Sequence, residues 1–568
     1  WKLSEKTTLN TNIAFQTGTI GNSRLDFQLG NNPDPTYYKN LPSYFNNLGG
    51  YTPSQLTQIG DTFRANSQID WNAMYIANQN SAFAGRSVYV LYEDRTDDNL
   101  LNANSIINSS LSDNIVLNAG VNVRKLRSHN HQNLLDLMGG QYFLDIDPFY
   151  SGNASQSDLN NPNRQIGENQ TYGYNYLLHA LTFDGFTQFK FTYDKVDFYL
   201  AQNFSRTEYQ REGLYKNGIY ADNSYGKGNS ITFENFGFKG GLTYKLNGRN
   251  YFDFNGLYQT KAPSLRNTFS NARLNNVITP DLQSERVTSA DASYILKTPK
   301  VKARLTGFYT KIQDATEISF FYGEGIGSDD GGDEDTFVSE IVTGIDKQNM
   351  GVELGLEYNI TSTIKATAAA SYGQYIYSDN AKLKTNDDAL AAAGNNSLTD
   401  FGTVYIKNYH QAGMPQTAAS FGLEYRDPNF WWIGANVNYL ANTYVDFANI
   451  LRTDNFSIDS ATGDNYSGAT PETVRAILKQ EKFNDFTLVN LTGGKSWRIS
   501  KANRNTVGFF ASVNNLFDIQ YKTGGFEQSR KATFPDLQAD QLNGTPSFGT
   551  KYFYGYGRTF FVNFYINF

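Results

Sequence analysis

The last nine residues of the chain alternate apolar and polar side chains in the period of a β-strand. Alternate side chains of a strand point to opposite faces, so one face of this segment suits hydrocarbon and the other suits water. An apolar strand at an unprotected sheet edge aggregates, whereas a membrane barrel closes such an edge against its first strand. The apolar face carries Phe560, Val562, Phe564, Ile566 and Phe568, and the other face carries Asn563, Tyr565 and Asn567 with Phe561.

The composition agrees with an all-β transmembrane antiparallel barrel. Only 39% of the 568 residues are apolar, yet the chain contains 41 phenylalanines and 39 tyrosines. No run of about 18 apolar residues is present, so the sequence predicts no membrane-spanning helix. Many aromatic residues at a negative mean hydropathy of −0.51 are typical of a barrel with aromatic girdles, a polar lumen and long polar outer loops.

The chain alternates short turn sequences with long connections, which is the rhythm of an outer-membrane barrel with long extracellular loops. Residues 352–360 show the alternation well, because Val352, Leu354 and Leu356 are separated by Glu353 and Gly355. A helix over residues 53–80 is expected inside the first long connection. About 16 strands are predicted, at 6–19, 86–111, 115–127, 174–192, 196–207, 230–246, 250–262, 284–296, 300–321, 341–360, 363–379, 414–426, 429–445, 483–499, 504–519 and 551–568.

Several classes of function are disfavoured. The chain has no cysteine, so disulfides and thiolate metal sites are excluded, and its net charge of −7 argues against nucleic acid as a partner. No arrangement resembles a serine, histidine and aspartate nucleophilic system, and no glycine-rich loop suits a phosphate. We therefore expect neither enzyme activity nor a cofactor.

Four segments resemble the barrel of TonB-dependent outer-membrane receptors, particularly the large, SusC-like or related forms of Bacteroidota. Each match is weak alone, but together they occur in the family's order and cover most of the chain. The terminal Phe568 resembles the aromatic residue that the barrel-assembly machinery recognises. The segments are Val513–Tyr521 (the penultimate-strand signature), Met350–Tyr358 (a recurring strand), and Lys261–Leu265 followed by Leu282–Arg286 (the proline loop and the next strand).

The resemblance implies a 22-stranded barrel preceded by a plug domain and a TonB box. We therefore expect residues 1–568 to be the carboxy-terminal barrel portion, with the plug and first strands missing before residue 1. The implied function is active uptake of a glycan, peptide or chelate across the outer membrane of a Gram-negative cell. The TonB–ExbB–ExbD system would supply the energy through the missing amino-terminal region, and a surface lipoprotein would form a lid.

Two alternatives remain open. The barrel could be a structural or assembly scaffold for surface lipoproteins or other envelope complex subunits. It could also be a complete 16-stranded passive porin, in which Phe560–Phe568 would pair with Lys6–Gly18. We expect that pairing to be absent.

Loop aromatic residues are the candidate substrate contacts. Tyrosine and phenylalanine rings stack on sugars and other apolar surfaces, while neighbouring amides supply hydrogen bonds. Packing between loops, or contact with a partner protein, is the competing interpretation. The candidates are Tyr37, Tyr38, Tyr44, Phe45, Tyr142 and Phe143, with Phe149 and Tyr150 in the same loops.

Metal sites have little support in the sequence. Asp329, Asp330, Asp333 and Asp335 form a weak calcium candidate, although a solvated acidic loop, bridged to lipopolysaccharide through divalent ions, explains them better. His129 and His131 would share one face of an extended segment, but the sequence shows no third ligand nearby. We therefore predict no metal at the histidine pair.

Overall fold

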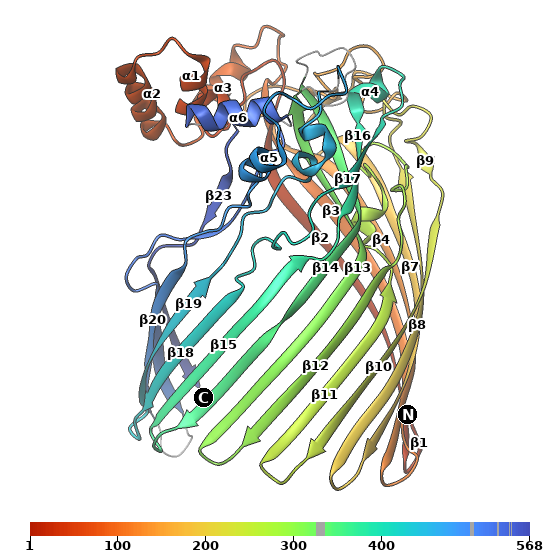
Figure 1. The fold of residues 1–568 in the computed structure, drawn as a ribbon. Helices are drawn as coiled ribbons and strands as arrows, with labels where there is room; N and C mark the ends of the chain where they lie inside the picture. The colour runs from red at the N-terminus through yellow and green to blue at the C-terminus, as the bar shows by residue number, and fades with distance from the viewer. Residues whose placement is uncertain are drawn as a thin grey trace.

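The protein folds into one large antiparallel sheet that curves into a barrel wall (Figure 1). The computed structural model describes residues 1–324, 335–459, 461–499, 505–530, 533–544, 546 and 548–567. Its main sheet has 20 strands, of which β1 (Lys2–Ser4), β9 (Gly226–Lys227), β16 (Ala381–Asp387) and β17 (Leu398–Val404) are short. The other 16 form the wall, so the predicted all-β antiparallel fold is confirmed. They are β2 (Thr7–Phe27), β3 (Tyr89–Ser110), β4 (Ile115–Asp136), β7 (Thr171–Thr192), β8 (Val196–Gly213), β10 (Ile231–Lys245), β11 (Asn250–Lys261), β12 (Glu285–Lys297), β13 (Val301–Glu324), β14 (Asp335–Asn359), β15 (Ile364–Tyr377), β18 (Thr417–Arg426), β19 (Trp431–Ala441), β20 (Phe486–Arg498), β21 (Thr506–Asn514) and β24 (Thr559–Asn567).

Each wall strand pairs with its neighbour along the chain, as in an up-and-down barrel. The series begins with β2 paired to β3 and ends with β21 paired to β24. Within the described residues, no hydrogen-bonded pairing joins β24 to β2; the short β1 pairs with Thr7 and Thr8 at the start of β2, and most of β2 and all of β24 present a free edge. Most side chains of both edge strands are exposed.

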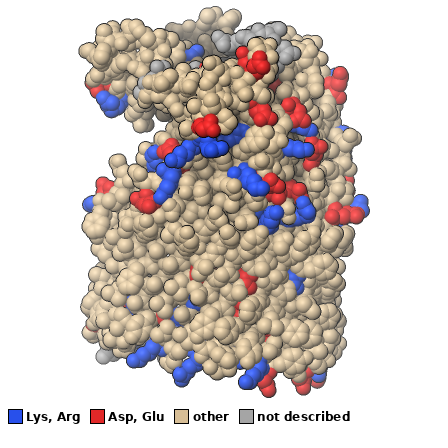
Figure 2. Space-filling view, viewed as in Figure 1, with Lys and Arg blue, Asp and Glu red and all other residues tan. Residues whose placement is uncertain are grey.

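The outer face of the wall carries a continuous apolar belt. Leu101, Val121, Leu354, Val437 and Phe564 alternate with inward residues on their strands and are between 41% and 78% exposed. Figure 2 shows the corresponding band of nearly uncharged surface, bounded above and below by lysine, arginine, aspartate and glutamate. Such a belt fits the hydrocarbon layer of a bilayer, and the charged residues fit its two polar surfaces.

The inner face of the wall is polar. Across β2, β3 and β4, asparagine side chains pair directly, with Asn12 to Asn104 at 3.1 Å and Asn108 to Asn118 at 2.6 Å. On β13 and β14, the ammonium group of Lys302 lies 2.9 Å from the carboxylate of Glu357. Glu357 follows the outward Leu356 on β14, and Lys302 is its cross-strand partner on β13, so both charges point inward.

Several strands continue well beyond the belt. At about 3.3 Å per residue, β13 and β14 are more than twice as long as the roughly 11 residues that a membrane crossing needs. The lower part of β14 pairs with β15, and its upper part pairs with β16. β16 and β17 form a hairpin inside residues 381–411, which the sequence analysis assigned to a connection. The predicted connection between the strands at 363–379 and 414–426 thus contains a hairpin, whose Leu383 and Val404 are buried against the other loops instead of facing lipid.

Among the described residues, helices occur only in the long connections, on the side of the barrel opposite the short turns (Figure 1). The helix expected over residues 53–80 is present as two helices, α2 (Pro53–Ala65) and α3 (Trp71–Gln79). No helix among the described residues is long and apolar enough to cross a membrane. The other helices and short strands are α1 (Pro42–Leu48), α4 (Asp388–Ala392), α5 (Pro471–Ile477), α6 (Phe534–Asn543), η1 (Tyr38–Asn40), η2 (Leu265–Thr268), η3 (Asn449–Arg452), η4 (Asp454–Phe456), β5 (Phe143–Leu144), β6 (Gln165–Ile166), β22 (Lys522–Phe526) and β23 (Lys551–Tyr554).

The largest apolar core lies in this outer loop assembly, above the membrane belt. Val342 of β14 and Leu383 of β16 pack there with Ile450, Phe456 and Phe534, which come from two further connections. Each of these side chains is at most 2% exposed. The connections that contribute to this core therefore form a packed cap.

Candidate functional site in the outer loop assembly

Four of the six predicted contact residues come together in the first long connection. Tyr37 and Tyr38 flank the start of η1, and Tyr44 and Phe45 lie on α1. The ring centroids are 4.8 Å apart for Tyr37 and Tyr38, 5.6 Å for Tyr38 and Tyr44, and 5.5 Å for Tyr44 and Phe45. All three contacts are edge-to-face, the geometry that favours attraction between aromatic rings. We call these four residues the loop aromatic cluster.

The loop aromatic cluster borders a concave site. Phe45 and Tyr51 line a cavity of about 580 Å³ together with Ile59 and Phe63 of α2. Gln55 and Asn66 add amide groups to the same wall. Apolar rings with a few amides suit a small or medium-sized ligand that has both apolar and hydrogen-bonding parts.

The carboxy-terminal loops contact the same cluster. The ring of Phe548 lies 4.9 Å from that of Tyr38, and the guanidinium of Arg530 lies over both rings, at 4.7 Å from Tyr38 and 5.1 Å from Phe548. Burial raises the pKa of the Tyr38 phenol. Sequence reasoning missed Phe548 and Arg530, because no local pattern connects residues about 500 positions apart.

Tyr142 and Phe143 lie away from the loop aromatic cluster. Phe143 has no exposed surface and packs against Val90, Leu134 and Tyr172 in a separate core. Tyr142 is half-buried, and its carbonyl oxygen accepts a hydrogen bond from the backbone of Ser87. Phe149, in contrast, is 75% exposed at the outer surface.

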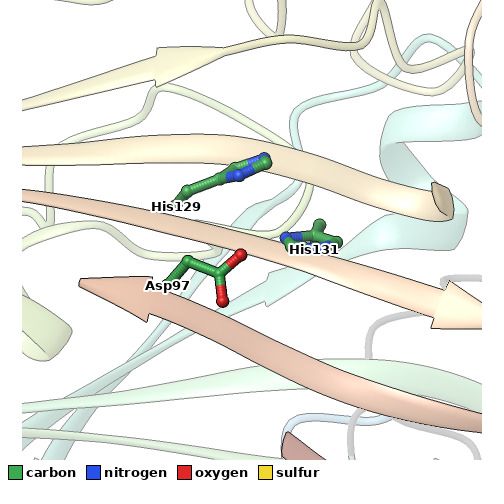
Figure 3. Close-up of side chains that lie close together, drawn as sticks. All are labelled: Asp97, His129 and His131. Carbon is green, nitrogen blue, oxygen red and sulfur yellow. The ribbon is translucent and has the colours of Figure 1, made fainter. Parts of the chain in front are cut away.

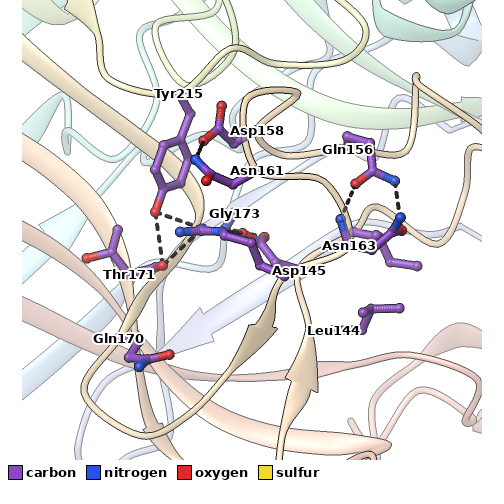
Figure 4. A network of polar contacts seen from close by, with 12 residues as sticks. Leu144, Asp145, Gln156, Asp158, Asn161, Asn163, Gln170, Thr171, Gly173 and Tyr215 are labelled. Atoms are coloured by element: carbon purple, nitrogen blue, oxygen red, sulfur yellow. Dashed lines mark hydrogen bonds and ion pairs between the residues drawn. The ribbon is translucent and has the colours of Figure 1, made fainter.

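Polar contacts hold the second long connection in one shape (Figure 4). The guanidinium of Arg164 pairs with the carboxylate of Asp145 and donates at 2.8 Å to the hydroxyl of Tyr215. The same carboxylate accepts from the backbone nitrogen of Gly173 at 2.9 Å, and the Tyr215 hydroxyl donates to the carbonyl of Thr171 at 3.0 Å. These contacts tie residues 145–173 to Tyr215, just after the end of β8.

A buried carboxyl group lies between three of the outer connections. The hydroxyl of Tyr220 donates to Asp388 on α4 at 2.6 Å, and the amide of Asn271 donates at 3.4 Å. Burial, with repulsion from Asp387, raises the pKa of Asp388 to about 7 despite these hydrogen bonds. Asp446 is a second such group, whose pKa burial raises to about 6.

Several predicted site residues cannot be placed. Asp329, Asp330 and Asp333 of the calcium candidate lie outside the described residues, as does Phe568. Asp335 begins β14, but its side chain is likewise outside the described part. His129 and His131, in contrast, are well placed on β4, and Asp97 of β3 lies beside them (Figure 3).

Comparison with protein families identifies the barrel. The β-barrel model of TonB dependent receptor-like proteins matches residues 1–516. The chain belongs to this family. The predicted outer-membrane location is thereby confirmed, as is the expectation that this receptor barrel is not an enzyme.

Solved structures share the fold of the receptor barrel at low sequence identity. The copper transporter OprC is 14% identical, with a TM-score of 0.50 over 83% of this chain and 57% of OprC. The siderophore receptor PiuA from Acinetobacter baumannii is 12% identical, with a TM-score of 0.51 over 84% of this chain and 60% of PiuA. The ferric-catecholate import receptor Fiu from E. coli K12 is 14% identical, with a TM-score of 0.48 over 99% of this chain and 61% of Fiu.

The receptor barrel therefore spans between 57% and 61% of the length of these three structures. At such identities the likeness concerns the fold alone, since one fold serves many substrates. No curated protein sequence matches the chain. The matches concern the TonB-dependent receptor family in general and do not point to its SusC-like branch.

Proposed function

We propose that the receptor barrel forms the wall and outer loops of a TonB-energised importer for a glycan, peptide or chelate. The observation that carries this proposal is the loop aromatic cluster beside its cavity of about 580 Å³, at the outer end of a barrel with a polar lumen. In this proposal, a substrate meets the rings at the outer end of the barrel before it enters the lumen. Edge-to-face rings and amides can bind such a substrate without a metal or a covalent bond.

The free edges of β2 and β24 support a larger barrel than the described strands form. Each edge presents unpaired backbone N–H and C=O groups, which cannot remain unsatisfied in a bilayer. In this proposal, further strands of the same receptor fill the interval between β24 and β2, and a plug domain occupies the lumen. The asparagine pairs of β2, β3 and β4 would then supply hydrogen bonds to the plug.

The partners follow from the same proposal. The TonB–ExbB–ExbD system delivers energy through the amino-terminal region, and lipid and lipopolysaccharide surround the belt. A surface lipoprotein lid, as in SusC-like receptors, would rest on the outer loop assembly. The packed cap of loops supports such a contact, because it presents a fixed surface to a partner.

The substrate-contact role is tested by replacing Tyr37 and Tyr38 with alanine in the whole receptor. We expect substrate-dependent growth or uptake to fall at least tenfold at equal protein levels. Tyr225 is the matched control, because it is a loop tyrosine that is 59% exposed and lies outside the loop aromatic cluster. Normal uptake by the Tyr37→Ala, Tyr38→Ala double variant would remove the cluster from the substrate path.

The barrel-closure proposal is tested by cysteine cross-linking, which the absence of native cysteine makes clean. Asn12 of β2 and Asn563 of β24 both point inward at the free edges. We expect no cross-link between cysteines at these two positions, or one residue pair to either side, with a short bis-maleimide reagent. Cysteines at Asn12 and Asn104, which pair across β2 and β3, should react in the same preparation.

The two alternatives predict different results. Efficient cross-linking of β2 to β24, with steady ion conductance in planar bilayers, would favour the 16-stranded passive porin. Normal barrel assembly and retention of bound lipoproteins, with no uptake of any substrate, would favour the scaffold. In that second case the loop aromatic cluster would serve as a docking surface for proteins.

A further inference from the structure

Three potential metal ligands meet on β3 and β4, far from the loop aromatic cluster. Asp97 and His129 are direct cross-strand partners, and His131 lies two residues further along the same strand. The ligand atoms of Asp97, His129 and His131 all lie within 4.8 Å of one another (Figure 3). The two imidazole rings are stacked, with their centroids 4.3 Å apart.

One of these side chains has an unsatisfied group. His131 is only 6% exposed, and its Nδ1 atom has no hydrogen-bond partner. A buried polar atom without a partner costs free energy that a bound cation or a hydrogen bond would recover. The ring nitrogen is therefore available as a ligand.

The neighbours orient the other two ligands. The Nε2 atom of His129 is 2.7 Å from the side-chain oxygen of Asn175, which leaves Nδ1 of that ring free. Asp97 accepts from the hydroxyl of Thr19 at 2.7 Å and from Nε of Arg95 at 2.9 Å. Outer hydrogen bonds of this kind hold histidine and carboxylate ligands in natural metal sites.

The site lies on the outer face of the wall. No register shift interrupts β3 and β4 between Thr96 and Ser110, so His129 and His131 share the face of Val121 and Val123. These valines are 49% and 39% exposed within the apolar belt. The three ligands thus lie just beyond the belt, on the outside of the barrel and away from the lumen.

We propose that Asp97, His129 and His131 bind one zinc ion on the outer wall of the barrel. Two imidazoles and one carboxylate match the nitrogen and oxygen ligands of zinc, and a water completes the tetrahedron. Zinc–ligand bonds of about 2.0–2.1 Å separate neighbouring ligand atoms by roughly 3.4 Å, so side-chain rotations need to draw the three together by no more than about 1.4 Å. Arg95 must release Asp97, and Glu93 can receive its guanidinium because the two already lie 3.5 Å apart.

The ion would link two neighbouring strands where the wall leaves the membrane. Because a metal that binds only the folded barrel stabilises it, zinc should raise the midpoint of thermal unfolding. The site does not depend on the proposed import function, since its ligands face away from the lumen. Failure of one proposal therefore leaves the other unaffected.

The test is isothermal titration of the detergent-solubilised whole receptor with zinc, before and after substitution. We expect one zinc ion per receptor, and loss of this binding in both D97N and H131N. His179→Asn is the matched control, because His179 lies on the same face of β7 and hydrogen-bonds Glu212 at 2.9 Å outside the cluster. Visible d–d absorption of bound cobalt, present in the wild type and lost in H129N, would report nitrogen ligation directly.

Two results would overturn the proposal. The first is a wild-type receptor that binds no zinc while its barrel is folded, as judged by heat-modifiable migration in gels. The second is binding that D97N and H131N leave unchanged. D97N preserves side-chain size, so a folded D97N barrel keeps the test decisive even if H131N does not assemble.

Discussion

The side chain of Asn78 pairs with the backbone of Tyr89 as a neighbouring strand would. Its amide nitrogen donates to the Tyr89 carbonyl at 2.8 Å, and its oxygen accepts from the Tyr89 nitrogen at 2.9 Å. The same amide also reaches the carbonyls of Leu137 and Met138, both at 3.0 Å. One residue of α3 thus joins the first loop to β3 and to the end of β4.

Asn78→Ala should release this part of the first loop. The substitution leaves buried backbone groups without partners, at a cost of about 1–3 kcal/mol for each one that water cannot reach. Hydrogen exchange across residues 71–88 and protease cleavage there should both increase. Asn66→Ala is the control, because Asn66 is exposed and its side chain donates only to the carbonyl of Thr62 in its own helix. Equal hydrogen exchange in the two variants would contradict the anchoring role of Asn78.

Arg452 and Glu527 form an ion pair between two further connections. The Arg452 side chain is 1% exposed, lies over the rings of Tyr409 and Phe447, and donates to the carbonyl of Leu478 at 3.1 Å. Removing one partner of a buried pair leaves an uncompensated charge, which costs roughly 3–5 kcal/mol.

Glu527→Ala should therefore loosen the cap around residues 446–482, measured by hydrogen exchange or limited proteolysis. The double variant Arg452→Met, Glu527→Leu should recover much of the protection, because it removes both charges from the interior. The interpretation fails if the double variant is as exposed to exchange as the single one.

The raised pKa of Asp388 makes the outer loop assembly sensitive to pH. Its folded-state pKa of about 7 exceeds the unfolded value of 3.8, so the folded state binds the extra proton between these limits. Local stability should consequently be highest near pH 4 and fall as the pH rises to about 7, because the unfolded state releases that proton first.

Hydrogen exchange in residues 381–404 should therefore be faster at about pH 8 than at about pH 5, after correction for intrinsic rates. Asp388→Asn should flatten this difference, since the amide does not titrate while keeping most of the hydrogen bonds to Tyr220 and Asn271. A pH profile that the variant leaves unchanged would assign the sensitivity to another group, such as Asp446.

The two faces of the wall should respond oppositely to added charge. Leu354 is 41% exposed on the apolar belt of β14, and Ser371 of β15 points into the lumen. Leu354→Arg should cost about 2–4 kcal/mol of barrel stability in lipid vesicles, whereas Ser371→Arg should cost about 1 kcal/mol or less. Denaturant-induced unfolding of the barrel from vesicles measures both losses of stability. Similar losses for the two variants would show that Leu354 does not face the lipid.

The wall was predictable because lipid imposes one rule on every strand. Within the belt an outward side chain must be apolar and an inward one can be polar, so β12 was expected at 284–296 and is found at Glu285–Lys297. Above the belt both faces are polar or packed against loops, and the alternation ends. The third predicted strand therefore ends at residue 127, whereas β4 continues to Asp136.

Because the alternation ends above the belt, the sequence also does not predict Asp97 as the third potential metal ligand. Asp97 becomes a neighbour of His129 only through the register of β3 against the upper part of β4. The loop aromatic cluster was partly visible, because Tyr37, Tyr38, Tyr44 and Phe45 are close in sequence. The sequence does not indicate that Phe548 and Arg530 belong to the same site, because only tertiary packing brings them to Tyr38.

The paired asparagines on the inner face give the lumen two unlike sides. An amide both donates and accepts, so a chain or solute sliding along β2, β3 and β4 exchanges one hydrogen bond for another of similar strength. Among these amides lie Arg124 and Asp184, 3.9 Å apart, whose opposite charges face each other across β4 and β7. Lys302 and Glu357, on the side formed by β13 and β14, present fixed charges that can detain a charged solute. An uncharged solute that forms hydrogen bonds should accordingly move more easily past the asparagine pairs than past Lys302 and Glu357.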